Sequence, residues 1–262
     1  MSYGRYYMRF AREASYSVAK GLALPLARRE AVATGRHAMS YPISTFSPWL
    51  TDEDFQSVYQ AVRQHTLVDI WRCYELWQLI AEVAEVPGGV LEVGVWRGGT
   101  GTLMARRAEL LGIADPIILC DTWEGVVNSG AIDTHYNDGE HSDASIAVVR
   151  ELVNRCTELG HVEVLKGMFP DETSDQIEDQ VLRFVHVDVD VYQSAAATFS
   201  WAWPRLSVGG IVVFDDYGFP STPGVTQFVD EQRGGADRMF VHNLNGHAIL
   251  IKRALPRRDG DS

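Results

Sequence analysis

The segment Phe184-Val-His-Val-Asp-Val-Asp-Val-Tyr192 decides how this chain folds, because an apolar run ends there in two carboxylates. A second segment, Gly209-Gly-Ile-Val-Val-Phe-Asp-Asp-Tyr217, repeats the pattern. Runs of Val, Ile and Phe are typical of strands that are buried on both faces of a parallel sheet. An ionised carboxylate is not buried there without a partner, so the acids must lie at the strand ends. The two segments therefore predict buried parallel strands with acidic tips.

These tips carry four aspartates, Asp188, Asp190, Asp215 and Asp216. If the strands are neighbours, the four side chains converge at the carboxyl edge of the sheet, where open α/β folds bind ligands. Two such charges about 4 Å apart repel by roughly 1 kcal/mol in water and about 4 kcal/mol at an effective dielectric constant of about 20. The cluster therefore needs a proton or a cation, and carboxylate oxygens suit Mg²⁺ or Ca²⁺.

The composition limits the number of cores and the kinds of partner. With 262 residues, 46% of them hydrophobic, the chain can bury one substantial core. A net charge of -12 argues against a nucleic-acid partner, and no stretch approaches the roughly 20 apolar residues of a membrane span. The three cysteines, Cys73, Cys120 and Cys156, stand in apolar surroundings. They indicate buried thiols in a reducing cytoplasm.

From residue 87 onward the sequence alternates between strand and helix patterns. The predicted strands are Val90–Val95, Ile117–Cys120, Val162–Leu165, Phe184–Val187 and Gly210–Phe214, followed by a hairpin of Met239–His242 and His247–Lys252. The predicted helices are Gly98–Leu111, about 144–159, Ser174–Gln180, Ala195–Trp203 and Gly224–Gln232. This rhythm predicts a doubly wound, mostly parallel sheet with an antiparallel hairpin at its edge.

Residues 1–86 form a predicted N-terminal arm and helical extension. The arm, to about residue 50, alternates helical patterns with Gly and Pro, and its first 40 residues are basic while the remainder of the chain is acidic. Two helices follow, one from a Thr51 cap to about Gln64 and one over Val68–Val86. We expect this extension to act as a lid or in a homo-oligomer, and residues 254–262 to be a tail.

The first strand leads into a glycine-rich turn, Leu91-Glu-Val-Gly-Val-Trp-Arg-Gly-Gly-Thr-Gly101. The spacing of Glu92, Gly94 and Gly98 is an E-x-G-x-x-x-G arrangement, which methyltransferases that bind S-adenosylmethionine often carry. It is not the G-x-G-x-x-G pattern of dinucleotide-binding proteins. A tight structural turn explains the glycines equally well.

Two further strand ends carry candidate donor-binding residues. Asp121 lies at the tip of the second strand, where an acid can accept hydrogen bonds from both ribose hydroxyls, although Asp is also a frequent turn cap. Met168 and Phe169 follow the third strand and could form walls for an adenine ring. At such positions Met and Phe are about as often ordinary core residues.

Five segments, in this order, carry a family resemblance between about residues 87 and 252. They are Val90-Leu-Glu-Val-Gly-Val-Trp-Arg-Gly-Gly, Asp121-Thr-Trp-Glu-Gly, Gly167-Met-Phe-Pro-Asp-Glu-Thr, Val187-Asp-Val-Asp-Val-Tyr and Phe214-Asp-Asp-Tyr-Gly. Together they resemble the macrocin-type (TylF) O-methyltransferases, which are class I, metal-dependent enzymes that methylate sugar hydroxyls on antibiotics and related natural products. The residues before about 50 do not match.

The resemblance implies a Rossmann-like class I methyltransferase domain over residues 87–253, with a glycosylated small molecule as methyl acceptor. It implies that Asp188, Asp215 and Asp216 hold a divalent ion, usually magnesium, and that Asp190 is the general base. The donor, S-adenosylmethionine, would contact residues at the ends of four strands. These are Glu92, Gly94, Val95, Trp96, Thr100, Asp121, Thr122, Met168, Phe169 and Asp188.

Plainer roles remain open for several of these residues. Asp190 could cap the helix that follows it, and Asp215 and Asp216 could be a solvated strand end. His186 has the same strand parity as Asp188 and could support it, although the role of a satisfied core histidine is favoured. His141 belongs to a long polar loop, 123–143, whose side chains could line the acceptor pocket.

Three other functions compete with a sugar O-methyltransferase. A metal-dependent enzyme that methylates a catechol or another phenol would use the same cofactors with a flat acceptor. A nucleotide-binding oxidoreductase is disfavoured because the dinucleotide pattern is missing. A protein that binds S-adenosylmethionine without catalysis would use its metal as a structural element.

Overall fold

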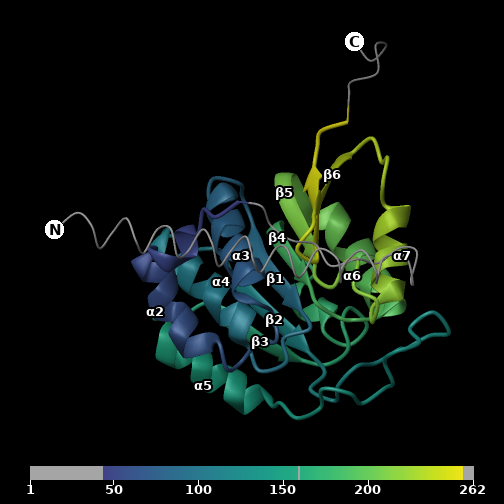
Figure 1. Cartoon of the computed structure of the whole chain (residues 1–262), viewed down its shortest axis with the longest axis horizontal. Helices are drawn as coiled ribbons and strands as arrows, with labels where there is room; N and C mark the ends of the chain where they lie inside the picture. Colours follow the sequence, from purple (N-terminus) through teal and green to yellow (C-terminus); the bar gives the residue numbers. More distant parts are fainter. Residues whose placement is uncertain (1–43, 159, 256–262) are drawn as a thin grey trace, which may run out of the picture. The chain divides into compact units, whose positions relative to one another are not determined.

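One seven-stranded sheet organises the chain, with strand order β3-β2-β1-β4-β5-β7-β6 (Figure 1). The computed structural model describes residues 44–158 and 160–255. The strands are β1 (Gly89–Val93), β2 (Ile117–Asp121), β3 (Val162–Lys166), β4 (Leu182–Val187), β5 (Leu206–Phe214), β6 (Arg238–Asn243) and β7 (His247–Lys252). Strands β1 to β5 pair in parallel, and β7 is antiparallel to both β5 and β6. The predicted doubly wound sheet with an edge hairpin is therefore confirmed.

Helices cover both faces of the sheet (Figure 1). They are α2 (Glu53–Val62), α3 (Ile70–Glu82), α4 (Gly99–Leu110), α5 (Ile146–Cys156), α6 (Tyr192–Arg205) and α7 (Pro223–Glu231), with short 3-10 turns η1 (Pro48–Leu50) and η2 (Ser174–Ile177). Helices α2 to α5 share one buried hydrophobic cluster with one face of the sheet. Helices α6 and α7 share a second cluster with the opposite face.

Aspartates, and not the threonine predicted from sequence, cap the first two helices. Asp52 accepts a hydrogen bond from the backbone N–H of Phe55 at 2.9 Å, so the predicted Thr51 cap is wrong by one residue. The Thr51 hydroxyl instead donates to the carbonyl of Pro48. Asp69 caps α3 by accepting from two backbone N–H groups. A carboxylate has the advantage at these positions because its negative charge also interacts with the helix dipole.

Some element boundaries differ from the sequence predictions. Helix α6 begins at Tyr192, three residues before the predicted Ala195, and the predicted helix at Ser174–Gln180 is only the short turn η2. Helices α2 and α3, which the sequence analysis grouped with the N-terminal extension, lie with the sheet in one compact unit from Ser47 onward. The predicted arm before residue 44 and the last residues of the predicted tail lie outside the described residues. Within residues 44–158 and 160–255, no helix is long and apolar enough to cross a membrane.

The strand order reverses between β1 and β4, and this brings the carboxyl ends of four strands together. Gly94, directly after β1, makes that approach possible because its φ is 88° and a Cβ there would lie 1.7 Å from the carbonyl oxygen of Asp188. Only glycine fits such a contact. In open α/β sheets, the crevice at such a reversal is where ligands bind.

Candidate active site

A cavity of about 220 Å³ opens at this crevice. It is lined by every predicted site residue except Glu92, namely Gly94, Val95, Trp96, Thr100, Asp121, Thr122, Met168, Phe169, Asp188, Asp190, Asp215 and Asp216. The ends of β1, β2, β4 and β5 and the segment after β3 therefore place the donor-site and metal-site candidates around one space.

Asp121 organises the turn after β1 and also faces the cavity. One of its carboxylate oxygens accepts hydrogen bonds from the backbone N–H groups of Val95 and Trp96, each at 2.7 Å. The other oxygen accepts from the N–H of Trp123, also at 2.7 Å. The turn-cap role considered for Asp121 is thus present in the structure. The oxygen that accepts only from Trp123 keeps acceptor capacity for a ligand hydroxyl.

The two predicted adenine walls differ in their surroundings. Phe169 is buried and packs edge-on against Trp201, with ring centroids 5.0 Å apart. Met168 is more exposed, and its sulfur accepts a hydrogen bond from the Asn128 side chain at 3.5 Å. Phe169 thus serves the hydrophobic core while one part of it borders the cavity.

Three aspartates form a compact donor set for a cation. One carboxylate oxygen each from Asp188, Asp215 and Asp216 lies within 4.8 Å of the others. Burial, with the neighbouring charges of Asp215 and Asp216, raises the pKa of Asp188. Burial, followed by the charges of Asp215 and Asp190, raises the pKa of Asp216 to about 9. These shifts express the need of the cluster for positive charge, and an all-carboxylate set matches the preference of Mg²⁺.

Asp215 is the member of this set that the protein itself neutralises. It is 2% exposed, and it accepts a hydrogen bond from the Arg72 guanidinium of α3. His247 Nε2 lies 3.2 Å from the same carboxylate oxygen. Burial alone would raise the pKa of Asp215, but His247 and Arg72 more than offset that effect and hold the pKa below its usual value. The predicted alternative of a solvated strand end therefore does not describe Asp215.

Asp190 lies beside the donor set in a strained turn. Its φ is 63°, and helix α6 begins two residues later without any side-chain cap, so Asp190 does not cap that helix. Burial raises the pKa of Asp190, while hydrogen bonds to Asp216 and Tyr136 and the charge of His141 act in the opposite direction. Left-handed backbone at a non-glycine residue is uncommon and often marks a functional position.

Glu92 lies behind the cavity and not in its wall. It is fully buried on β1, and its Oε1 pairs with His186 Nδ1 on β4 at 2.9 Å. Gly101 of α4 packs so closely that a Cβ there would lie 2.4 Å from Glu92 Oε2. Glu92 therefore pairs with His186 inside the protein, whereas the other predicted donor-site residues line the cavity.

Sequence reasoning missed Arg72 and the segment 65–68, which also line the cavity. The spacing of Arg72, Leu76 and Ile80 could have revealed the arginine, because these residues share one side of a helix and all three are buried. A charged residue on a buried helix face needs a partner, but the partner Asp215 is 143 residues away in the sequence.

Replacing Arg72 by methionine should destabilise the fold by roughly 3–5 kcal/mol, because Asp215 then stays buried without its hydrogen-bonded cation. Urea unfolding of the wild type and of the Arg72→Met variant measures the difference in the free energy of unfolding. The exposed Arg63, at the end of α2, provides the control, since Arg63→Met should change stability by less than about 0.5 kcal/mol. An Arg72→Met variant as stable as the control would show that this ion pair does not hold the fold.

Comparisons with known proteins agree with this fold. The family model described as Macrocin-O-methyltransferase (TylF) matches residues 54–240. An 8-demethyl-8-(2,3-dimethoxy-alpha-L-rhamnosyl)-tetracenomycin-C 4'-O-methyltransferase from Streptomyces olivaceus is 33% identical over 198 residues, which are 67% of this chain and 72% of the relative. Demethyldecarbamoylnovobiocin O-methyltransferase from Streptomyces niveus is 30% identical over 66% of this chain and 69% of the relative.

The structure of the O-methyltransferase NovP superposes with a TM-score of 0.61 at 27% identity, over 72% of this chain and 82% of that one. The matched region of the family model includes β1 to β5, whose carboxyl ends form the cavity. This chain thus belongs to the macrocin O-methyltransferase (TylF) family and is an S-adenosylmethionine-dependent O-methyltransferase.

Proposed function

We propose that this enzyme methylates a sugar hydroxyl of a glycosylated natural product in a reaction that requires a divalent cation, Mg²⁺ in the first place. Asp190 is the general base, and Asp188, Asp215 and Asp216 hold the ion. The observation that carries the proposal is the position of Asp190 in the cavity wall beside three carboxylates whose oxygens lie within 4.8 Å of one another.

The aspartates fit a magnesium ion in chemistry and in charge. All three donors are hard oxygens, and the raised pKa values of Asp188 and Asp216 reflect like charges held together in a buried place. Arg72 and His247 compensate the charge of Asp215, and Arg72 also lies 3.6 Å from Asp216, so three carboxylates share little positive charge. When bound, a divalent ion lowers the pKa of a hydroxyl that coordinates it.

Asp190 is placed to take the proton that the acceptor hydroxyl loses as its oxygen attacks the donor methyl group. An alcohol is far less acidic than an ordinary carboxylic acid, so a raised pKa at Asp190 makes it a better base near neutral pH. Tyr136, in the loop that follows β2, hydrogen-bonds to Asp190 and restricts its orientation. A base held in this way needs less reorganisation when the acceptor hydroxyl reaches it.

Two observations support a sugar as the methyl acceptor: the name of one relative, and the polar side chains of the loop that follows β2. The tetracenomycin relative is named for methylation at the 4' position of a rhamnosyl group. In this chain Tyr136 and His141 contribute polar groups to the cavity beside Asp190. Polar groups there suit an acceptor with several hydroxyls, whereas a catechol would be held mainly by flat apolar walls.

We propose that the cavity residues at the ends of β1 and β2 bind the methyl donor. Asp121 accepts hydrogen bonds from the ribose hydroxyls of the donor. Glu92 acts from behind by supporting the strand ends and not by contact. Met168 and Phe169 border the adenine position. Of the three cysteines predicted as buried thiols, Cys73 and Cys120 are buried and Cys156 is only partly buried. The two buried free thiols agree with a cytoplasmic location. We also propose that the enzyme forms a homo-oligomer.

The Asp121→Asn variant should bind S-adenosylhomocysteine roughly 10- to 100-fold more weakly, because hydrogen bonds to a charged acceptor are worth about 1.5–3 kcal/mol. Isothermal titration calorimetry measures the change. Asp143→Asn is a matched control, since Asp143 is exposed and bonds to Trp96 Nε1 and Arg97 on the outside of the same turn. Equal affinity of the Asp121 variant and the wild type would remove Asp121 from the donor site.

Product analysis tests the proposed function. The enzyme is incubated with isotope-labelled S-adenosylmethionine, Mg²⁺ and a panel of glycosylated natural products, their aglycones and a catechol, and mass spectrometry locates the label. We expect one labelled methyl group on a sugar fragment and none on the aglycone. Label only on the catechol or on an aglycone would replace the sugar acceptor by an aromatic one.

A further inference from the structure

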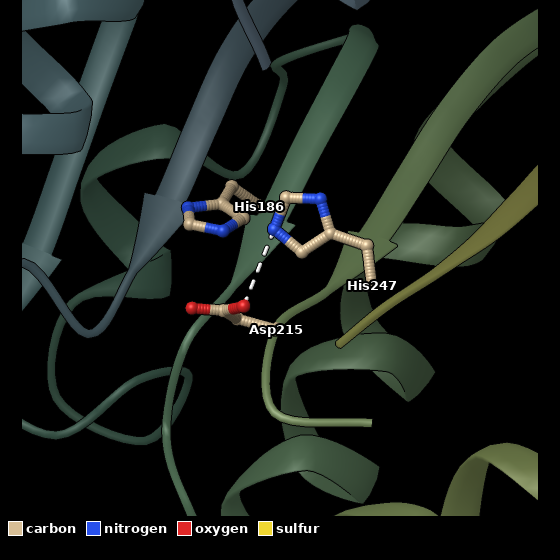
Figure 2. Close-up of side chains that lie close together, drawn as sticks. All are labelled: His186, Asp215 and His247. Carbon is tan, nitrogen blue, oxygen red and sulfur yellow. Dashed lines mark ion pairs between the residues drawn. The ribbon is translucent and has the colours of Figure 1, made fainter. Parts of the chain in front are cut away.

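Two buried histidines face the carboxylate of Asp215. The histidines lie next to the cavity but are not part of its lining. His186 lies on β4 and His247 on β7, and Asp215 directly follows β5, so the three residues come from neighbouring strands. Their exposed fractions are 0%, 0% and 2% in that order. Figure 2 shows both imidazole rings on the same side of the Asp215 carboxylate. One ligand atom from each residue lies within 4.8 Å of the others.

Each histidine is backed by its own carboxylate through the nitrogen that points away from Asp215. His186 Nδ1 lies 2.9 Å from Glu92 Oε1, and His247 Nδ1 lies 2.6 Å from Glu75 Oε2. Metal-binding histidines show this pattern, because a carboxylate on one ring nitrogen fixes the tautomer that leaves the other nitrogen free for the metal. Among the described residues, His186 Nε2 is buried without a hydrogen-bond partner, and His247 Nε2 faces Asp215 Oδ1 at 3.2 Å.

We propose that His186, His247 and Asp215 form a second cation site, which takes a divalent transition metal such as zinc. Two imidazoles and one carboxylate favour Zn²⁺, Ni²⁺ or Co²⁺ over Mg²⁺, which prefers oxygen ligands. Donors on one tetrahedral zinc ion lie about 3.3 Å apart, and His247 Nε2 is 3.2 Å from Asp215 Oδ1. His186 has to approach by on the order of 1 Å to complete the site.

The charge around this site favours a dication. Four carboxylates lie in one connected layer, those of Asp69, Glu75, Glu92 and Asp215, and Arg72 is the cation paired with two of them. These four carboxylates and Arg72 carry a formal charge of -3 between them, before any charge on the two imidazoles is counted. Buried charge without compensation is costly, so an ion between the rings offsets a real deficit.

The ion in this site is structural. His186 and His247 do not border the cavity, so the ion joins β4, β5 and β7 and fixes Asp215 from behind. Asp215 would then serve both the transition metal and the acidic set in the cavity. The inference depends on neither the sugar acceptor nor methyl transfer, and metal binding alone tests it.

The experiment is a titration of chelator-treated, full-length enzyme with Zn²⁺ in buffer that contains millimolar Mg²⁺, followed by calorimetry and by elemental analysis after gel filtration. We expect one retained Zn²⁺ per chain. Its binding should raise Tm by roughly 10 °C when free Zn²⁺ is about 1,000 times its Kd. Failure to retain zinc under these conditions would overturn the proposal.

Four variants separate this site from the acidic set. His247→Gln and His186→Gln should each weaken Zn²⁺ binding at least roughly 100-fold, because each removes an imidazole donor. Asp188→Asn alters only the acidic set and should leave Zn²⁺ affinity within about threefold. His242→Gln, an exposed histidine on β6, controls for the substitution itself. Zinc lost from Asp188→Asn but kept by the His247 and His186 variants would assign the ion to the acidic set and overturn the proposal.

Wild-type crystals give an answer even if the two buried variants fail to fold. Anomalous diffraction at the zinc edge should place one peak between the two imidazoles and Asp215. A peak only among Asp188, Asp215 and Asp216, or no peak, contradicts the site.

Discussion

The Asp190→Asn variant should lose roughly 10²- to 10⁴-fold in kcat while it binds S-adenosylhomocysteine as the wild type does. An amide cannot take the proton of the acceptor hydroxyl, and general-base catalysis contributes about that factor. The substitution keeps the shape of the side chain and one of its two acceptor oxygens. The rate loss is therefore expected in the chemical step, with little change in donor affinity.

Single-turnover kinetics with saturating donor and acceptor measures this loss, and calorimetry measures donor affinity. Asp138→Asn provides the control, because Asp138 lies in the same cavity loop as Tyr136 and accepts hydrogen bonds from Ser129 on the exposed side. A near-normal rate for Asp190→Asn would exclude Asp190 as the base. A parallel loss of donor binding would give it a binding role instead.

Removal of divalent cations should reduce the rate at least roughly 100-fold, since a bound ion is worth several kcal/mol of transition-state stabilisation. The physical reason lies in the acidic set. Without an ion, burial and neighbouring charges raise the pKa of Asp216 to about 9, so this carboxyl group carries a proton at neutral pH. An acceptor hydroxyl then meets no cation that could increase its acidity.

Rates are compared in excess EDTA, in EDTA saturated with Mg²⁺ beforehand, and after Mg²⁺ is added back. Magnesium alone should restore the rate, and the presaturated chelator should have no effect. Donor binding should persist in EDTA, because Asp121 and the β1 turn contain no residue of the acidic set. Full activity in excess EDTA would remove the metal from the mechanism.

The sequence predicted the sheet and the grouping of the site residues for a clear physical reason. Apolar runs that end in acids, such as those before Asp188 and Asp215, mark buried parallel strands and show where they end. Parallel strands meet their ligands at one edge, so strand ends found one by one can be combined into one site. Gly94 was predicted from the glycine-rich turn after the first strand, and its close contact with the Asp188 backbone explains why no side chain fits there.

What the sequence did not reveal depends on contacts between distant segments. Arg72 reaches Asp215 across 143 positions, and His247 reaches Glu75 across 172. No local pattern encodes such pairs. Glu92 was predicted among the donor-site residues because of its spacing from Gly94, but strand alternation turns its side chain to His186 and away from the cavity. The Thr51 cap was missed by one residue because two adjacent residues both had capping side chains.

The most direct test of this account is a crystal structure of the enzyme with Mg²⁺ and S-adenosylhomocysteine. The account predicts one ion bound by carboxylate oxygens of Asp188, Asp215 and Asp216, with the donor product beside it in the cavity and Asp190 free to reach an acceptor. Side chains of the three aspartates that point apart with no ion between them, or a cavity that excludes the donor product, would contradict it.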